Sequence, residues 1–292
     1  MGLRAHLLGM AVLLGLYLAL LFPFTTYMAN KPYVEKLGII PRAEVLQVIS
    51  ADQKQLVGAS VIGKVIMYFG GLVDGGKTGE IRVPADYPAM SRTIYAALKL
   101  DPYNMDGYYF AQAILVWDVG QYQIANNLLE YGMKYRTWDW YLPFFVGFND
   151  AYFLKDYKNA AQMYMRAGKL SGNPLFESLA GRYLQQSGQT EMAIAYLTMM
   201  AKGAREPAIR KSFQTRLQAF REVRLIEEAR DRFKADHGRM PERIDTLVAG
   251  GYLKKAPVDP YGGEFYFEPD GSVATTSKFA YAGVRHAGEK GK

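Results

Sequence analysis

Small and bulky hydrophobic residues recur between Ala85 and Pro207 at a period of about 34 residues. The first recurring position is occupied by Met90, Ala125, Ala160 and Ala193. The large residue that follows four positions later is Ile94, Leu129, Tyr164 or Leu197. A small side chain lets two helices approach closely, and the large one fills the space beside the contact. The pattern therefore predicts the second helix of a helix-turn-helix unit at each of these four places.

This spacing resembles the tetratricopeptide repeat (TPR) family, in which each repeat is a pair of helices. The resemblance covers three helix pairs from Asn104 to Pro207 and a half repeat from Pro84 to Pro102, within a domain spanning 84–207. Ala180-Gly181-x-x-Leu184 fits the first-helix motif of the family, and Pro102 stands where the second helix ends. The resemblance implies an α-solenoid. The alternative is an irregular helical bundle with accidental spacing.

The N-terminal segment, residues 1–30, contains an uncharged apolar run from Leu7 to Phe24. Its length approaches that of a transmembrane helix, which favours a signal anchor in the membrane. A cleaved signal peptide is the alternative, but Thr25 to Asn30 offers no convincing small-x-small cleavage site. Residues 31–83 follow as a connector, with helices expected at Ala43–Ile49 and Gln53–Leu72. The second of these is expected to cap the solenoid.

The C-terminal part, residues 208–276, departs from the repeat pattern. Apolar residues at helical spacing predict a long helix from Ala208 to His237, which Gly238 would end. Phe265–Phe267 and Val273–Thr276, separated by a turn, predict a β-hairpin packed on that helix. The segment between carries the ordered residues Gly238, Pro241, Gly251-Tyr252-Leu253, Pro257, Asp259-Pro260 and Gly262.

That ordered string resembles the segment after the long helix of the major pseudopilins of type II secretion. The resemblance implies a small α+β domain that works outside the cytoplasmic membrane. The prepilin cleavage site of that family is missing, and clustered carboxylates do not follow Thr276, so no calcium site is carried over. The remaining residues, 277–292, are expected to form a flexible tail. The expected fold is thus mostly α, with a transmembrane helix, a TPR-like solenoid and a small α+β domain.

Composition and motifs favour binding over catalysis. The chain of 292 residues has a formal charge of +7, no cysteine and three dispersed histidines, so no metal cluster or catalytic relay is expected. Gly71 to Thr78 matches the phosphate-loop pattern, but Pro84 would block the helix that must follow such a loop. We therefore expect no cofactor, no small-molecule substrate and no enzymatic activity. A nucleotide-using enzyme remains an alternative class.

The repeats are rich in aromatic residues, and the TPR resemblance assigns a partner-binding groove to their first helices. Its expected lining is Phe110, Trp117, Asp118, Phe145, Asn149, Tyr152, Ser178, Arg182 and Gln185. An aromatic groove with few charges suits an apolar or amphipathic protein segment. The sequence therefore predicts a scaffold for an envelope or secretion-type complex, anchored in the cytoplasmic membrane with its bulk in the periplasm. Nucleic acid is not an expected partner. The alternative is a structural, pseudopilin-like subunit of a pilus or secretion machine.

Overall fold

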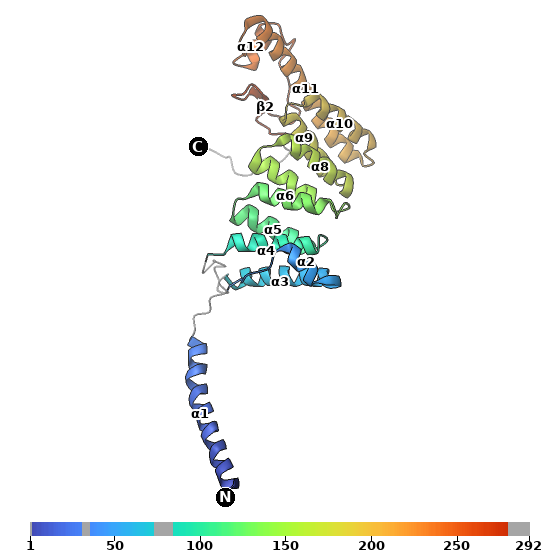
Figure 1. Ribbon diagram of the computed structural model, residues 1–292. Coiled ribbons are helices and arrows are strands. Elements are labelled where there is room, and N and C mark those ends of the chain that lie inside the picture. Colours follow the sequence, from blue (N-terminus) through green and yellow to red (C-terminus); the bar gives the residue numbers. More distant parts are fainter. Residues whose placement is uncertain (1, 31–35, 73–83, 280–292) are drawn as a thin grey trace. The chain divides into compact units, whose positions relative to one another are not determined.

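The computed structural model describes residues 2–30, 36–72 and 84–279. The chain divides into two compact units, which we describe separately. One comprises Met1–Ile40 and Gly63–Met90, and the other comprises Pro41–Ile62 and Ser91–Lys292. The described residues are mostly helical, with one two-stranded antiparallel sheet (Figure 1).

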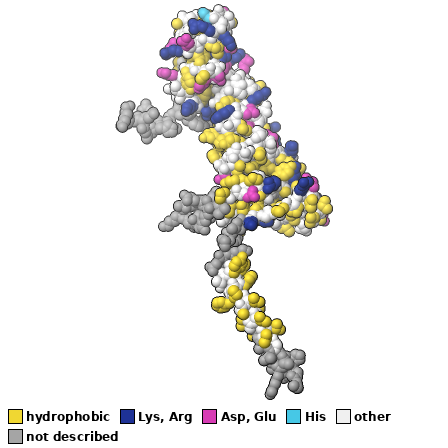
Figure 2. All heavy atoms as spheres, turned by 60° about the vertical axis from the view of Figure 1, so that its left-hand side comes forward, with side chains coloured by type: hydrophobic (Ala, Val, Ile, Leu, Met, Phe, Trp, Pro, Cys, Tyr) yellow, Lys and Arg dark blue, Asp and Glu magenta, His cyan; other side chains and the backbone are white. Residues whose placement is uncertain are grey.

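Helix α1, Gly2–Asn30, carries the apolar N-terminal run. Its described large apolar side chains, between Met10 and Met28, are exposed, and Leu13 and Phe22 are 69% and 80% accessible. Figure 2 shows hydrophobic side chains along α1 without charged ones among those drawn in colour. Within the described residues, its apolar part, Val12–Met28, falls short of the length of a full membrane span.

The helices before the repeats are α2, Ala43–Ile49, and α3, Lys54–Leu72, separated by a 3-10 turn at Ala51–Gln53. Both helices lie where the sequence predicts them. The segment Ala51–Leu72 is long and apolar enough to cross a membrane, a property that the sequence analysis did not assign to it. Its first half nevertheless contacts protein. Gly58 lies against Ala97 and Asp101, and Ile62 lies against Gly107, as expected of a capping helix.

The repeat region consists of consecutive helices, each packed on the next (Figure 1). The bounds are α4 Tyr87–Leu100, α5 Met105–Ala113, α6 Tyr122–Met133, α7 Tyr141–Asn149, α8 Tyr157–Ser171, α9 Pro174–Gln186 and α10 Thr190–Gly203. The four second helices that the repeat pattern predicts are present as α4, α6, α8 and α10. Asn104, Asp156 and Asn173 cap α5, α8 and α9 with side-chain oxygens that accept backbone N–H groups.

Glycine and alanine make the closest contacts within the helix pairs. Ala160 and Ala193 are fully buried, as their place in the repeat requires. Gly147 of α7 lies against the ring of Tyr164 in α8, and Gly181 of α9 lies against Leu197 in α10. A side chain at either glycine would push the paired helices apart. Two of the large residues that define the repeat, Tyr164 and Leu197, therefore pack against a glycine of the preceding first helix.

The first helices of two pairs continue into π-helical turns, η2 at Ile114–Asp118 and η3 at Asp150–Leu154. In each turn a backbone N–H reaches the carbonyl five residues earlier, from Val119 to Ile114 and from Lys155 to Asp150. A π-turn accommodates an extra residue and rotates the side chains that follow it. Lys155 then reverses the chain in a left-handed conformation, with φ of 57°.

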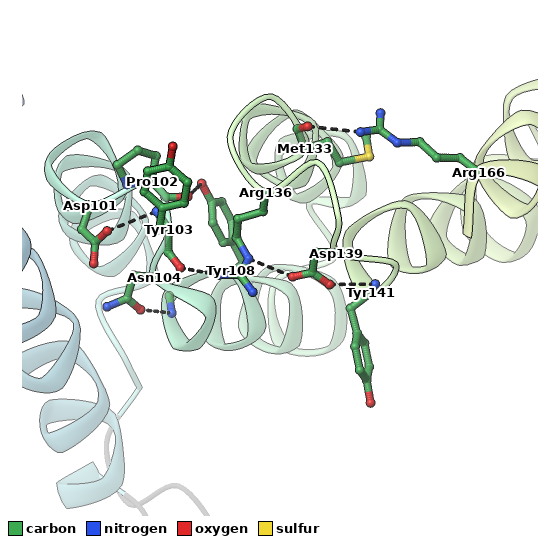
Figure 3. Close-up of polar contacts among 11 residues, drawn as sticks. Asp101, Pro102, Tyr103, Asn104, Tyr108, Met133, Arg136, Asp139, Tyr141 and Arg166 are labelled. Carbon is green, nitrogen blue, oxygen red and sulfur yellow. Dashed lines mark hydrogen bonds and ion pairs between the residues drawn. The ribbon is translucent and has the colours of Figure 1, made fainter. Parts of the chain in front are cut away.

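The loops between repeats are tied by arginine side chains (Figure 3). Arg136 donates one hydrogen bond to the carbonyl of Tyr103, at 2.6 Å, and another to Asp139, at 2.8 Å. Arg166 donates to the carbonyl of Met133 at 3.1 Å. Each arginine thus satisfies a carbonyl in the preceding interhelix loop or helix end. These contacts fix the stacking of one repeat on the next.

The C-terminal elements are α11 Pro207–His237, α12 Ile244–Ala249, β1 Phe265–Phe267 and β2 Val273–Thr275. The long helix and the hairpin confirm the prediction, and Gly238 ends α11 with φ of 69°. In the hairpin, Tyr266 faces Ala274 across an antiparallel pair. Asp259 braces the chain beside the hairpin by accepting hydrogen bonds from the hydroxyls of Thr275 and Ser277.

The C-terminal elements share one hydrophobic core with the last repeats. That core includes Ala161, Leu184 and Leu197 from the repeats together with Phe220, Leu247 and Val273. Arg216 of α11 is buried and donates to the carbonyls of Ser178, at 3.0 Å, and Phe279, at 2.8 Å. The repeat pattern of the sequence therefore ends near residue 207, but the hydrophobic core continues across this predicted boundary. Of the predicted tail, residues 280–292 lie outside the described residues.

Candidate partner-binding surface

The nine residues predicted to line a groove all lie on the first helices of the pairs or on their π-helical ends. Phe110 lies on α5, Phe145 and Asn149 on α7, and Ser178, Arg182 and Gln185 on α9. Trp117 and Asp118 belong to η2, and Tyr152 belongs to η3. The structure leaves an exposed group, a half-buried group and a buried group: respectively Trp117, Asp118 and Tyr152; Phe110, Phe145 and Arg182; and Asn149, Ser178 and Gln185.

The exposed group centres on what we call the aromatic cluster, formed by Trp117, Tyr122, Phe148, Tyr152 and Phe153. Trp117 and Tyr152 do not touch each other in a ring contact, but both pack on Phe148 and Phe153. The ring centroid of Trp117 lies 6.2 Å from that of Phe148 and 5.6 Å from that of Phe153. The ring centroid of Tyr152 lies 5.6 Å from that of Phe148 and 4.8 Å from that of Phe153. Tyr122 stacks on Phe153 at 4.2 Å. Because Trp117 and Tyr152 remain 65% and 60% exposed, the cluster presents two large aromatic faces to solvent.

The π-helical turns place these two side chains. Trp117 and Tyr152 each lie within the turn that extends a first helix, so the added residue sets the direction in which each ring projects. Two charged side chains, Asp118 and Lys155, lie at the margin of the cluster. Asp118 is exposed beside Trp117, and the Lys155 ammonium lies 5.5 Å from the Tyr152 ring. The arrangement suits an apolar segment with a charged or polar edge.

Asn149 lies in a buried polar network and not at the surface. Its Nδ2 donates to Gln112 Oε1 at 3.0 Å and to Asn126 Oδ1 at 2.8 Å. Asn126 in turn donates to Asp150 Oδ1 at 2.6 Å, and Asn159 donates to Asp150 Oδ2 at 2.6 Å. The network joins α5, α6, α7, η3 and α8. The predicted contact of Asn149 with a partner is therefore replaced by an internal role, because the residue has no accessible surface.

Asp150 carries the charge of this network. Burial raises the pKa of Asp150 to about 6, against the hydrogen bonds from Asn159 and Asn126, which lower it. The nearby carboxylates of Asp156 and Glu130 add to the rise. The two amide donors satisfy both carboxylate oxygens, so the network tolerates the ionised form at neutral pH.

At the third helix pair the expected groove is covered by the C-terminal elements. Gln185 is buried and its Nε2 donates to the carbonyl of Val273 in β2 at 3.4 Å. Ser178 is buried, and its carbonyl accepts the hydrogen bond from Arg216. Arg182 is half-buried over the ring of Tyr183. Ser178 and Gln185 therefore offer no open surface, and the exposed part of the predicted set belongs to the first two pairs.

Sequence reasoning recognised the aromatic residues of the repeats but omitted three members of the cluster, Tyr122, Phe148 and Phe153, from the groove. Their contribution depends on the π-turns, which no sequence pattern indicated. It also missed a cavity of about 500 Å³ lined mainly by the second helices α4 and α6, with Leu115 of η2. There the Lys99 ammonium lies 4.0 Å from the centroid of Tyr131. The repeat register gave no reason to expect a cavity there.

The described residues show no metal site, and most of the candidate phosphate loop lies outside them. Among them, no group of three or more histidine, cysteine or acidic side chains is arranged to hold a metal ion. The phosphate-loop match at Gly71 to Thr78 falls mostly outside the described residues, since 73–83 are not among them. Its dismissal therefore stays a prediction.

Comparison with known proteins gives no family assignment. No family model matches the chain, and no curated protein matches it. The solved structure titled MamA AMB-1 is 15% identical over 53% of this chain and 90% of that chain, with a TM-score of 0.33. We draw no functional conclusion from a likeness of this size. Nothing in these comparisons supports the pseudopilin resemblance.

Proposed function

We propose that this protein is a membrane-anchored, TPR-like scaffold that binds protein partners through the aromatic cluster. It acts by binding, with no catalytic step and no cofactor. The partner offers an apolar or amphipathic segment that covers Trp117 and Tyr152. The observation that carries the proposal is the exposure of these two rings on a rigid, paired-helix support.

The aromatic cluster is large, and its rings are already packed in place before a partner binds. Tryptophan and tyrosine are enriched among the interface residues that dominate binding energy. Phe148 and Phe153 pack against both exposed rings, so a partner would lose little entropy in ordering them. Burial of a large aromatic side chain is worth about 1.5–3 kcal/mol. A partner that covers both rings would therefore gain a substantial part of its affinity from the cluster.

Membrane anchoring is supported by α1, and the choice of compartment is supported by a different part of the chain. The exposed apolar side chains of α1 would be unfavourable in water over so long a helix, and a bilayer would remove this cost. We place the repeats in the periplasm, at the cytoplasmic membrane, within an envelope or secretion-type complex. This placement follows from the sequence resemblance of residues 238–266. The alternative role as a pilus-like subunit has no supporting observation among the described residues, and we do not propose it.

The test compares two tryptophans of similar exposure. Trp117 belongs to the aromatic cluster, whereas Trp138 is 59% exposed in a loop, where it stacks on Tyr103. Tagged full-length chain is extracted in mild detergent after crosslinking in cells, and the captured proteins are quantified. We expect Trp117→Ala and Tyr152→Ala to reduce a specific partner by about tenfold or more. Trp138→Ala should retain it. Equal recovery of the partner with Trp117→Ala and wild type would contradict the proposal.

A further inference from the structure

A second cavity, of about 470 Å³, lies between α10 and α11 and is lined mainly by basic and polar side chains. Its floor is formed by the buried residues Ala201 and Leu217. Its open rim is formed by the half-buried Thr198 and by four exposed side chains, Lys202, Arg210, Gln214 and Arg221. None of these residues belongs to the aromatic cluster, and the sequence analysis assigned them no role.

The helix geometry explains why these side chains converge. Residues 210, 214, 217 and 221 follow the spacing that places side chains on one face of α11. Thr198, Ala201 and Lys202 lie in the last turns of α10, opposite that face. Arg210 is oriented by a hydrogen bond from its Nη2 to the carbonyl of Ala204, at 2.7 Å. The remaining N–H groups of its guanidinium are left for a ligand.

The charges around this cavity are not balanced by protein. Its lining contains three cationic side chains and no acidic one. Within the described part of the chain, no hydrogen bond or ion pair involves Lys202 or Arg221. By contrast, Arg224, one turn further along α11, pairs with Glu228 at 3.1 Å and Glu191 at 3.7 Å. The same seam between helices therefore neutralises one arginine and leaves three cations around an open cavity.

Like charges that face one cavity repel one another, and a bound anion removes that repulsion. We infer that the cavity between α10 and α11 binds a phosphate group. The guanidinium groups of Arg210 and Arg221 can each donate two parallel hydrogen bonds to phosphate oxygens, and Lys202 adds a compact positive charge. Gln214 supplies a neutral donor. The group can belong to a soluble phosphate compound or to the headgroup of an anionic lipid, and the apolar floor tolerates either.

Two ligand arms distinguish these sources, with the full chain in neutral detergent at low salt. In the first, inorganic pyrophosphate is titrated by calorimetry. In the second, phosphatidylglycerol or phosphatidylcholine is mixed into the micelles, and the shift in melting temperature is recorded. The variants are Arg221→Gln and Lys202→Gln. The matched control is Lys211→Gln, which removes the same charge from α11 at an exposed position outside the cavity.

We expect one pyrophosphate site whose affinity falls about tenfold or more in Arg221→Gln and Lys202→Gln but stays within about twofold of wild type in Lys211→Gln. Binding of phosphatidylglycerol alone, with the same pattern among variants, would assign the site to a lipid headgroup. Melting curves without ligand check that each variant is folded, and the two cavity variants serve as checks on each other. No response to either phosphate ligand, or an equal loss in Lys211→Gln, would overturn the inference.

Discussion

Gly181 of α9 lies so close to Leu197 of α10 that a Cβ atom at position 181 would stand 2.8 Å from Leu197 Cγ. Leu197 is fully buried, so it has little room to move. We expect Gly181→Ala to destabilise the protein by about 1–3 kcal/mol, because overpacking forces the two helices apart. The free energy of unfolding is measured by urea titration, followed by circular dichroism.

Gly203 provides the control for that substitution. It ends α10, and a Cβ atom there would meet no atom within 4 Å. Gly203→Ala should leave stability unchanged or raise it by up to about 1 kcal/mol, because alanine favours the helix. If the two variants unfolded at the same urea concentration, the proposed contact between α9 and α10 would be wrong.

The raised pKa of Asp150 predicts a pH-dependent stability. Because its pKa moves from 3.8 to about 6 on folding, the folded state binds the proton more tightly than the unfolded state. Its contribution is fully present below pH 3.8 and is lost as the pH rises through about 6. In Asp150→Asn this dependence should vanish. The stability of wild type relative to Asp150→Asn should therefore fall as the pH rises over that window, in unfolding curves measured at several pH values.

An unchanged difference between wild type and Asp150→Asn across the same window would show that Asp150 does not titrate there. Asp270 offers a comparison outside the network. A hydrogen bond from Ser272 lowers the pKa of Asp270, so its linkage has the opposite sign. Asp270→Asn should therefore not remove the fall in stability assigned to Asp150.

Arg216 connects the C-terminal elements to the third helix pair, and its removal should loosen both. In Arg216→Met the carbonyls of Ser178 and Phe279 lose a charged donor, at an expected cost of about 1–3 kcal/mol. Hydrogen exchange should increase in residues 261–279 before it increases in α5 or α6. Arg232→Met removes a hydrogen bond to the Tyr252 carbonyl from an exposed part of the same helix, and it should cost much less.

Membrane attachment and sidedness are tested by one pair of measurements in cells. Full-length chain should remain in the membrane fraction after an alkaline wash, and deletion of residues 2–30 should weaken that retention. An alkaline phosphatase fused after Phe279 should be active if the repeats face the periplasm. Inactive phosphatase, together with a folded cytoplasmic reporter at the same position, would reverse the proposed orientation.

The repeat helices could be predicted because their determinants are local. Ala160 and Tyr164 lie four residues apart on one helix, and their spacing reveals the packing face without knowledge of the neighbour. The long helix and the hairpin could be predicted for the same reason, because Gly238 ends the helix and the turn after Phe267 separates the two strands. The contacts between Gly181 and Leu197 then follow from the register of the repeat.

The polar network and the covered groove could not be predicted in this way. Asn149 occupies a position that the repeat pattern assigns to the groove, and only the fold brings it to Gln112, at 37 residues' separation. Gln185 meets Val273 across 88 residues. A single sequence shows which residues are polar, but it does not show which polar residues face one another. The π-turns were missed because an extra helical residue leaves no periodic signal of its own.

The burial of Gln185 and Ser178 beneath the C-terminal elements has a consequence for assembly. A repeat stack with a bare terminal helix pair presents an adhesive surface on which another copy of the chain can continue the array. Here α11 occupies that surface on α10, and β2 reaches α9. The C-terminal elements of the same chain thus cover this end of the repeat stack, and that surface is closed to a helix pair from a second molecule.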